Sequence, residues 1–505
     1  MKNQVQLITY VDRLGGGTLR ELEGLLAGPL AGLFGTVHLL PFFDPIDGAD
    51  AGFDPIDHTR VDARLGTWED VARLGRQVDL MADVIVNHMS CDSLQFKDFS
   101  RRGHASVYDG LFLTLEAVFP DGAHEHELTA IYRPRPGLPL TPVTLQNGEK
   151  RILWTTFTPQ QLDIDVRHRQ GRAYLESILK TFSEHGIRAI RLDAVGYAIK
   201  RAGTSCFMLP ETFEFIGELT ALARSLDMEV LVEVHSHYLR QLDIAARVDW
   251  VYDFALPPLV LHALFNGTAG YLKHWIEIRP RNALTVLDTH DGIGVIDVGP
   301  EAGTGRDGLL PAAEIDRLVE TIHERSGGQS RRATGAAASN LDLYQVNCAF
   351  YDALGRIDRD YLLARAVQFF LPGIPQVYYV GLLGGGNDMP LLERSGVGRD
   401  INRGRYGPHE VLRELARPVC ADLLRLIRLR NTHPAFGGAL RIGRTASNVL
   451  ALRWEAGSAH AELIADFAAR RWTVRHGEGA VSESLEFASC PALWSDAPRD
   501  IVWRG

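Results

Sequence analysis

Short apolar segments rich in β-branched residues alternate with longer helical patterns through most of this chain. The segments with the strand pattern are 5–11, 36–42, 80–88, 187–195, 228–235, 250–256, 283–291 and 374–380. Helix starts lie between several of them: Thr18 and Glu21 have the spacing of a capping box, and Thr67 can cap the segment EDVARLGRQ. Strands and helices that alternate about eight times predict an α/β fold, the (β/α)8 TIM barrel.

Two intervals between predicted strands are too long for simple connections. The first follows the third strand and is Pro-rich, and the second follows the seventh strand and is rich in Gly, Ala and Ser. Both leave the C-terminal ends of strands, where barrel enzymes carry their active sites, so we expect two functional, loop-inserted subdomains. From residue 436, short alternating strands predict a C-terminal all-β domain. The expected boundaries are barrel segments 1–88, 171–291 and 356–435, subdomain B 89–170, subdomain B′ 292–355 and the C-terminal domain 436–505.

The composition excludes several classes of function. The 505 residues carry 53 Lys and Arg against 63 Asp and Glu, a net charge of -10, whereas a nucleic-acid binder should show a basic patch. No apolar run approaches the roughly 18 residues of a membrane span, and Asp12 and Arg13 interrupt the first strand before a signal peptide could form. The five scattered cysteines lack CxxC spacing, which is typical of free thiols in a reducing compartment. We therefore expect a cytoplasmic protein that binds neither nucleic acid nor membrane.

Charged and polar residues gather where the predicted strands end. They are Asn87 and His88 in the third strand, Arg191 and Asp193 in the fourth, Glu233 and His235 in the fifth, and Asp288, His290 and Asp291 in the seventh. Arg191 and Asp193 are two positions apart, so they share one face of the strand IRAIRLDAV. Three carboxylates from three strands, Asp193, Glu233 and Asp291, should therefore meet at one rim of the barrel.

Paired carboxylates are the groups that cleave glycosidic bonds. One attacks the anomeric carbon, and the other protonates the leaving oxygen. Asp193 suits the nucleophile because Arg191 favours its ionised form. Glu233, among the apolar residues of VLVEVH, suits the acid, which later acts as the base. Asp291 remains to stabilise the positive charge that develops on the sugar ring.

Four segments, ADVIVNH, IRLDAV, LVEVH and VLDTHDG, resemble the ordered motif set of the α-amylase superfamily, glycoside hydrolase family 13. The resemblance runs from the first strand to the C-terminal β domain and implies a (β/α)8 barrel with retaining chemistry. It implies that Asp193 is the nucleophile, Glu233 the acid/base and Asp291 the transition-state stabiliser. The residues that it implies around the glucosyl ring are His88, Arg191 and His290.

Longer stretches resemble the sucrose phosphorylase family within that superfamily. They are GADAGFDPIDH, IYRPRPGLP, WTTFTPQQLDID, GTSCFMLPETF, GAAASNLDLYQVN and GRDINRGRY. The resemblance implies that Asp50 and Arg399 close the far end of the glucose pocket and that Phe53 lines it. Such a pocket admits one glucosyl unit, which favours sucrose over starch. It further implies inorganic phosphate as second substrate and hints at a homodimer.

The choice of phosphate over water needs a site that binds and orients the anion. Arg135 and Tyr344, which lie in the two insertions, are the expected phosphate ligands. Asp342 would bind fructose hydroxyls but repel phosphate, so we hypothesise that loop 333–347 rearranges after fructose leaves. Alternatively, Arg135 and Asp342 pair and join the two loops. Gln345 is expected to contact substrate.

Several alternatives stay open. Phe157 could pack over the acceptor or belong to the core of the insertion. The acceptor could be fructose 6-phosphate, glycerol or glycerate, although LDLYQ supplies no basic residue for a phosphorylated sugar. A hydrolase or transglucosidase of the same fold would need no anion site, and a carbohydrate-binding protein without activity would need no carboxylate trio. His235 and His237 lack a third zinc ligand, and no oxygen-ligand set is evident, so we expect neither metal nor cofactor.

Overall fold

A closed barrel forms the centre of the molecule. The computed structural model describes residues 1–48, 50–133, 137–301, 305–335, 345–490, 494, 497–498 and 501–504. In these residues eight parallel strands close in the order β1-β16-β13-β12-β11-β10-β5-β2. Their bounds are β1 Gln6–Thr9, β2 Thr36–Leu39, β5 Asp79–Ile85, β10 Ile187–Asp193, β11 Glu229–Val232, β12 Trp250–Asp253, β13 Ala283–Thr285 and β16 Ile374–Tyr378. Each overlaps one predicted strand segment, which confirms the (β/α)8 barrel.

Helices surround the barrel, and their starts follow the predicted capping chemistry. The helices outside the two insertions are α1 Leu19–Ala27, α2 Trp68–Leu74, α6 Arg169–Glu184, α7 Pro210–Ser225, α8 Tyr238–Ala245, α9 Leu256–Asn266, α10 Gly270–Ile278, α14 Asp358–Phe370, α15 Tyr379–Leu382, α16 Met389–Ser395, α17 Pro408–Leu415 and α18 Pro418–Thr432. Thr18 and Glu21 form the expected capping box at α1, and Thr67 forms one with Asp70 at α2. Local sequence and tertiary fold therefore agree at both helix starts.

Two groups of elements interrupt the barrel where insertions were predicted. Between β5 and α6 lie β6 His88–Ser90, α3 Leu94–Arg102, η1 Gly103–Ala105, α4 Leu115–Val118, α5 Glu125–Ala130, β7 Leu140–Thr144, β8 Lys150–Trp154 and β9 Gln161–Asp163. Between β13 and α14 lie β14 Ile293–Gly294, α11 Ala312–Arg325, α12 Gln329–Thr334, β15 Gln345–Val346 and α13 Phe350–Ala353. β6 pairs with β9, so the chain that leaves β5 is fastened directly to the first insertion. The exact boundaries of subdomains B and B′ stay predictions.

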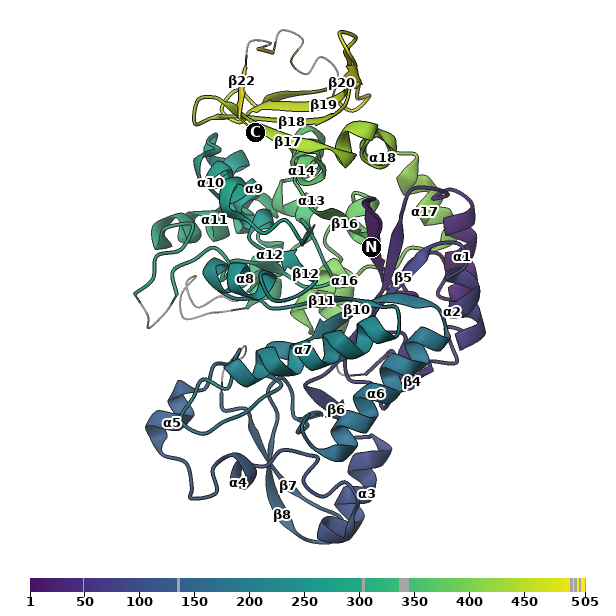
Figure 1. The fold of residues 1–505 in the computed structure, drawn as a ribbon, viewed down its shortest axis with the longest axis vertical. Helices are drawn as coiled ribbons and strands as arrows, with labels where there is room; N and C mark the ends of the chain where they lie inside the picture. The colour runs from purple at the N-terminus through teal and green to yellow at the C-terminus, as the bar shows by residue number, and fades with distance from the viewer. Residues whose placement is uncertain are drawn as a thin grey trace.

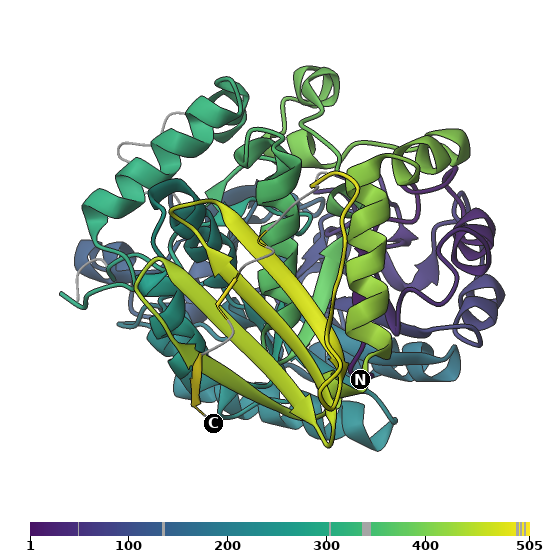
Figure 2. The same ribbon diagram turned by 90° about the horizontal axis from the view of Figure 1, so that it is seen from above.

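The C-terminal part is the predicted all-β unit. Its sheet has the order β21-β20-β19-β18-β17-β22. The strands are β17 Ala439–Arg444, β18 Val449–Ala456, β19 Ala459–Asp466, β20 Arg471–Glu478, β21 Glu483–Ser484 and β22 Val502–Arg504. Trp454 Nε1 donates to the Phe370 carbonyl at 2.8 Å, which ties the sheet to the end of α14. Figure 1 shows this sheet at the opposite end of the molecule from the first insertion, and Figure 2 shows α18 running beside it.

Membrane spans and disulfides are two features for which there were expectations from the sequence. Among the described residues, no helix is both long enough and apolar enough to cross a bilayer. The five cysteines, Cys91, Cys206, Cys348, Cys420 and Cys490, are free thiols, as their scattered spacing predicted.

A buried histidine predicts acid sensitivity. His58 in β4 (Asp57–Val61) is fully buried, and this burial lowers the pKa of its imidazole to about 4. In the unfolded chain the imidazole of His58 takes up a proton below its usual pKa of 6.5, whereas in the folded protein it does so only below about 4. The unfolded state therefore binds more protons between these two pH values. The stability that His58 contributes is complete above pH 6.5 and is lost as the pH falls towards 4. We expect His58 to account for about 3 kcal/mol of the loss in unfolding free energy between pH 7 and pH 4. Urea denaturation of His58→Gln should show a correspondingly shallower dependence on pH, and an unchanged dependence would contradict the assignment.

Candidate active site

The three expected catalytic carboxyls lie on the side of the barrel where the strands have their C-terminal ends. Asp193 is the last residue of β10, and Glu233 directly follows β11. Asp291 was predicted at the end of the seventh strand. It lies six residues after the end of β13, on the connection to β14. Ala194 has φ 54°, a left-handed conformation that turns the chain sharply after Asp193. Its backbone N–H donates to Glu233 Oε2 at 3.4 Å, which links the two neighbouring strand ends.

These carboxyls open into one cavity, whose empty volume is about 710 Å³ when the space open to solvent is included. The predicted site residues that line it are Asp50, Phe53, His88, Phe157, Asp193, Glu233, His290, Asp291, Gln345 and Arg399. Arg191 lies buried behind Asp193. Arg135, Asp342 and Tyr344, the expected acceptor and phosphate residues, lie outside the described residues. The structure therefore brings together the expected glucosyl site.

Arg191 organises the floor of the cavity. Its Nη1 donates to Asp193 Oδ1 at 2.8 Å and to Asp83 Oδ1 at 2.5 Å. Its Nη2 lies 3.8 Å from Glu233 Oε1. Asp83 is itself held by His38 at 3.0 Å, and the Arg191 side chain is only 2% exposed. One immobile guanidinium thus contacts both the expected nucleophile and the expected acid.

The ionisation of Asp193 differs from the expectation. Burial raises the pKa of its carboxyl well above the usual range, although Arg191 opposes this shift. The negative charges of Glu233, Asp83 and Asp291 raise it further. Arg191 acts in the predicted direction, but burial and the neighbouring negative charges outweigh it, so the expectation that it keeps Asp193 ionised is wrong. Asp193 accepts directly from Arg191 at 2.8 Å, whereas Glu233 Oε1 lies 3.8 Å from the guanidinium, so Arg191 is closer to the expected nucleophile than to the expected acid.

Asp291 has the opposite electrostatic environment. Although burial opposes ionisation, Arg399, His290 and Arg403 hold the pKa of the Asp291 carboxyl far below its usual range. Arg399 Nη1 lies 2.7 Å from Asp291 Oδ1, and Arg403 Nη2 lies 3.9 Å from it. Asp291 therefore carries a permanent negative charge beside the cavity, as a group that stabilises a developing positive charge requires.

Rings and neutral imidazoles wall the glucosyl end of the cavity. Phe53 stacks on His290 with centroids 4.8 Å apart and an interplanar angle of 8°. Burial lowers the pKa of both His88 and His290, so these imidazoles are neutral near pH 7 and offer hydrogen bonds without charge. Phe157 meets His88 edge-on with centroids 5.4 Å apart, lines the cavity and also packs on the core, and a contact with the acceptor stays a prediction.

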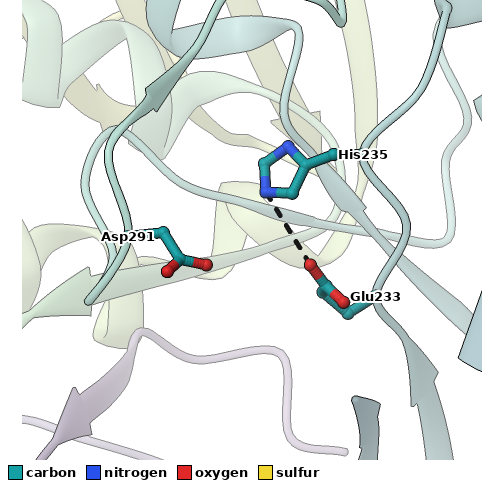
Figure 3. Close-up of side chains that lie close together, drawn as sticks. All are labelled: Glu233, His235 and Asp291. Carbon is teal, nitrogen blue, oxygen red and sulfur yellow. Dashed lines mark ion pairs between the residues drawn. The ribbon is translucent and has the colours of Figure 1, made fainter. Parts of the chain in front are cut away.

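His235 was placed at the end of the fifth strand by the sequence analysis but was given no role in the site. Figure 3 shows that it faces the same space as Glu233 and Asp291, and its Nε2 lies 3.8 Å from Glu233 Oε1. Its Nδ1 lies 3.0 Å from buried Asp297, which orients the ring, and Gln345 Nε2 lies 3.3 Å from its Nε2. Glu233, His235 and Asp291 offer ligand atoms within 4.8 Å of one another, a spacing that could suit a metal ion.

Three arginines already supply positive charge to this trio. Arg399 contacts Asp291, Arg403 lies near it, and Arg191 lies near Glu233. A divalent cation would meet these charges at close range, so we assign no metal here. The expectation that the enzyme needs no metal stays a prediction.

The remaining lining residues were not singled out by the sequence analysis, although several of them lie within its motifs. They are Gln161, Ala194, Gly196, Tyr197, Phe207 and Val234. Tyr197 and Phe207 pack with centroids 4.8 Å apart and form an aromatic wall near Phe157. Tyr197 could have been found from the sequence, because it follows Asp193 by four residues on the same strand-end loop.

An eight-stranded parallel barrel with this carboxylate trio at its C-terminal rim defines an α-amylase-type glycosidase. Residues 33–254 match the family model for the α-amylase catalytic domain. The chain is 60% identical to a sucrose phosphorylase from Agrobacterium vitis, over 94% of this chain and 97% of that protein. It is 53% identical to one from Bifidobacterium adolescentis, over 92% of each. The crystal structure of sucrose 6F-phosphate phosphorylase from Thermoanaerobacter thermosaccharolyticum superimposes with a TM-score of 0.89 at 36% identity, covering 96% of this chain and 98% of that one.

The chain belongs to the α-amylase superfamily, glycoside hydrolase family 13, and within it to the family of the sucrose phosphorylases.

Proposed function

We propose that this enzyme is a phosphorylase that converts sucrose and inorganic phosphate reversibly into α-D-glucose 1-phosphate and D-fructose. The observation that carries the proposal is that the carboxylate trio of Asp193, Glu233 and Asp291 lines one cavity. The two sucrose phosphorylases to which the chain is 60% and 53% identical support the choice of substrate.

In the first half-reaction Asp193 attacks the anomeric carbon and forms a covalent β-glucosyl ester. Glu233, in its acid form, gives a proton to the fructosyl oxygen, so that fructose leaves as a neutral alcohol. Glu233 becomes a carboxylate in this step, and the ester on Asp193 carries no charge, so the two side chains do not repel each other in the intermediate. The fixed negative charge of Asp291 stabilises the positive charge that develops on the ring.

In the second half-reaction phosphate replaces fructose and attacks the same carbon from the opposite face. Glu233, now a carboxylate, accepts a proton from the incoming acceptor, and Asp193 leaves. Two inversions give net retention, and water produces glucose by the same route as a side reaction. Arg135 and Tyr344 as phosphate ligands, Asp342 as fructose ligand and the rearrangement of loop 333–347 remain predictions that lie outside the described residues.

The nearest alternative acceptor is a phosphorylated fructose. The solved structure at 36% identity is named a sucrose 6F-phosphate phosphorylase. A phosphate on the acceptor needs basic residues near it, and residues 341–345 read LDLYQ. Unmodified fructose is therefore the proposed leaving group. A homodimer and a cytoplasmic location remain predictions that accompany this function.

The compounds that the enzyme forms from sucrose and inorganic phosphate test the proposed reaction. We expect glucose 1-phosphate of α configuration and an equal amount of fructose, because two inversions at one carbon restore the starting configuration. Proton and phosphorus NMR of the glucose 1-phosphate distinguish its anomers, which do not interconvert because the anomeric oxygen carries the phosphate. A β-configured product would contradict the covalent Asp193 intermediate.

A further inference from the structure

A buried carboxylate with no part in the chemical steps described above lies behind the expected acid. Asp297 follows β14 in the second insertion and is fully buried. Its Oδ2 lies 3.0 Å from His235 Nδ1. Its Oδ1 accepts from the Ser236 backbone N–H at 3.1 Å and from Gln241 Nε2 at 2.8 Å. One oxygen of this carboxylate thus faces two N–H donors, and the other faces the imidazole.

The Gln345 amide shows which nitrogen of His235 carries the hydrogen. Gln345 Oε1 accepts from the Gly292 backbone N–H at 3.2 Å, so its NH₂ group faces His235 Nε2 at 3.3 Å. Because an amide NH₂ group can only donate, His235 Nε2 accepts. The hydrogen of the neutral ring therefore lies on Nδ1, which donates it to Asp297. The hydrogen bonds run in one direction, from the Gly292 N–H to the Asp297 carboxylate.

Close packing fixes the members of this chain. The Phe254 ring stacks on the His235 imidazole with centroids 3.7 Å apart and an interplanar angle of 14°. Gly294 lies opposite Gln345 in the pairing of β14 with β15. A Cβ atom on Gly294 would lie 2.3 Å from Asp297 Oδ2 and 3.2 Å from His235 Nδ1, so this glycine leaves the room that the contact between the two side chains needs.

The charge of the ring decides whether the chain is complete. Burial opposes a positive charge on His235, whereas the carboxylates of Asp297, Glu233 and Asp291 favour it, and together they leave the pKa of His235 above its ordinary value. A second proton would enter on Nε2 and would face the Gln345 NH₂ group. The chain is therefore complete in the neutral ring, on the alkaline side of this pKa.

The chain lies on the side of the cavity where the leaving group is protonated. His235 Nε2 lies 3.8 Å from Glu233 Oε1, and both His235 and Gln345 line the cavity (Figure 3). The Gln345 amide uses one N–H on His235, and its second N–H meets no acceptor among the residues that the structure describes. That N–H is left to donate to an oxygen of the sugar that departs.

We propose that Asp297 is a positioning residue: it keeps the hydrogen of His235 on Nδ1 and so sets the direction of the chain that presents the Gln345 N–H to the leaving sugar. Asp297 acts on substrate only through these two neighbours. The inference rests on the proposed function in one respect, since it takes sucrose as the donor, and it does not depend on phosphate as the acceptor.

Asp297→Asn tests the proposal, because the amide keeps the shape of the side chain. The N–H donors of Ser236 and Gln241 hold the amide oxygen on their side, so the new NH₂ group must face His235 Nδ1. The hydrogen of the ring then moves to Nε2, where it opposes the Gln345 NH₂ group. We expect kcat/KM for fructose release from sucrose to fall roughly 10- to 100-fold. The loss for α-glucosyl fluoride, which has no leaving sugar, should be much smaller.

A double-mutant cycle separates this role from a purely structural one. His235→Ala removes the ring through which Asp297 is proposed to act, so adding Asp297→Asn to it should lower kcat/KM by no more than about twofold. A structural role would reduce kcat/KM equally in both backgrounds. Asp243→Asn changes an exposed carboxylate of α8 that pairs with Arg247, and it is the matched control. It should keep the kcat/KM of its parent in both backgrounds.

Nitrogen-15 NMR of the histidine-labelled wild type decides the matter if Asp297→Asn does not fold. The imidazole signals of His235 are assigned by their loss in His235→Ala. At a pH above the pKa of the ring, they should show the hydrogen on Nδ1 and none on Nε2. In folded Asp297→Asn the two nitrogens should exchange these roles.

A hydrogen on Nε2 of the neutral wild-type ring would overturn the proposal, as would wild-type kcat/KM in Asp297→Asn. Equal losses in the two backgrounds, or equal losses for sucrose and for glucosyl fluoride, would also overturn it. Fructose release and the imidazole signals are measured without reference to glucose 1-phosphate. A wild-type enzyme that forms no glucose 1-phosphate would therefore refute the proposed function and leave the role of Asp297 to be judged by these two readouts.

Discussion

Asp193→Ala should lower kcat for sucrose by about 10⁴-fold or more, because the variant has no group that can form the glucosyl ester. Arg191, which remains, keeps its contact with Asp83 and cannot act as a nucleophile. The measurement is the initial rate of fructose release at saturating sucrose and phosphate.

The same substitution should not reduce stability. Burial raises the pKa of Asp193, so the folded protein disfavours its charged form and the carboxyl costs stability at neutral pH. The melting temperature of Asp193→Ala should therefore equal or exceed that of the wild type. Asp243→Ala, which removes an exposed carboxylate paired with Arg247, is the matched control and should keep full activity. Substantial turnover by folded Asp193→Ala would rule out a covalent intermediate on this residue.

Glu233→Gln should lower kcat for sucrose by about 10²- to 10⁴-fold, because fructose must leave with a proton that glutamine cannot supply. The loss should be much smaller for α-glucosyl fluoride, whose leaving group needs no proton. The amide keeps the size of the side chain, so its place beside Arg191 and His235 is preserved. Comparison of kcat for the two donors gives the test.

Equal losses for sucrose and for glucosyl fluoride would show that Glu233 does not act as the acid. His237→Gln is a suitable control, since His237 is buried near the site but lies 3.0 Å from the Asp307 carbonyl and does not line the cavity. It should leave the ratio of the two rates unchanged.

The barrel and its carboxylates could be predicted because both depend on local patterns. β-Branched apolar runs identify the strands, and a charged residue at the end of such a run has few structural reasons to be there. Asp193 and Glu233 were found in this way, and the pairing of Arg191 with Asp193 followed from the two-residue period of a strand.

The electrostatics of the cluster could not be predicted, because they depend on residues distant in sequence. Only Arg191 was weighed for the charge of Asp193 from the sequence, whereas in the fold burial, together with the negative charges of Glu233, Asp83 and Asp291, outweighs Arg191. Asp291 was expected at a strand end and lies on a loop, where Arg399 holds it. Contacts of this kind form only when the barrel closes.

The central claim is that phosphate, rather than water, takes the glucosyl group from Asp193. The direct measurement quantifies glucose 1-phosphate, free glucose and fructose from sucrose, with and without inorganic phosphate, under otherwise identical conditions. We predict that with phosphate most of the fructose released is matched by glucose 1-phosphate, and that without it fructose release slows and only free glucose accompanies it. Free glucose equal to fructose in the presence of phosphate, with no glucose 1-phosphate, would contradict the account.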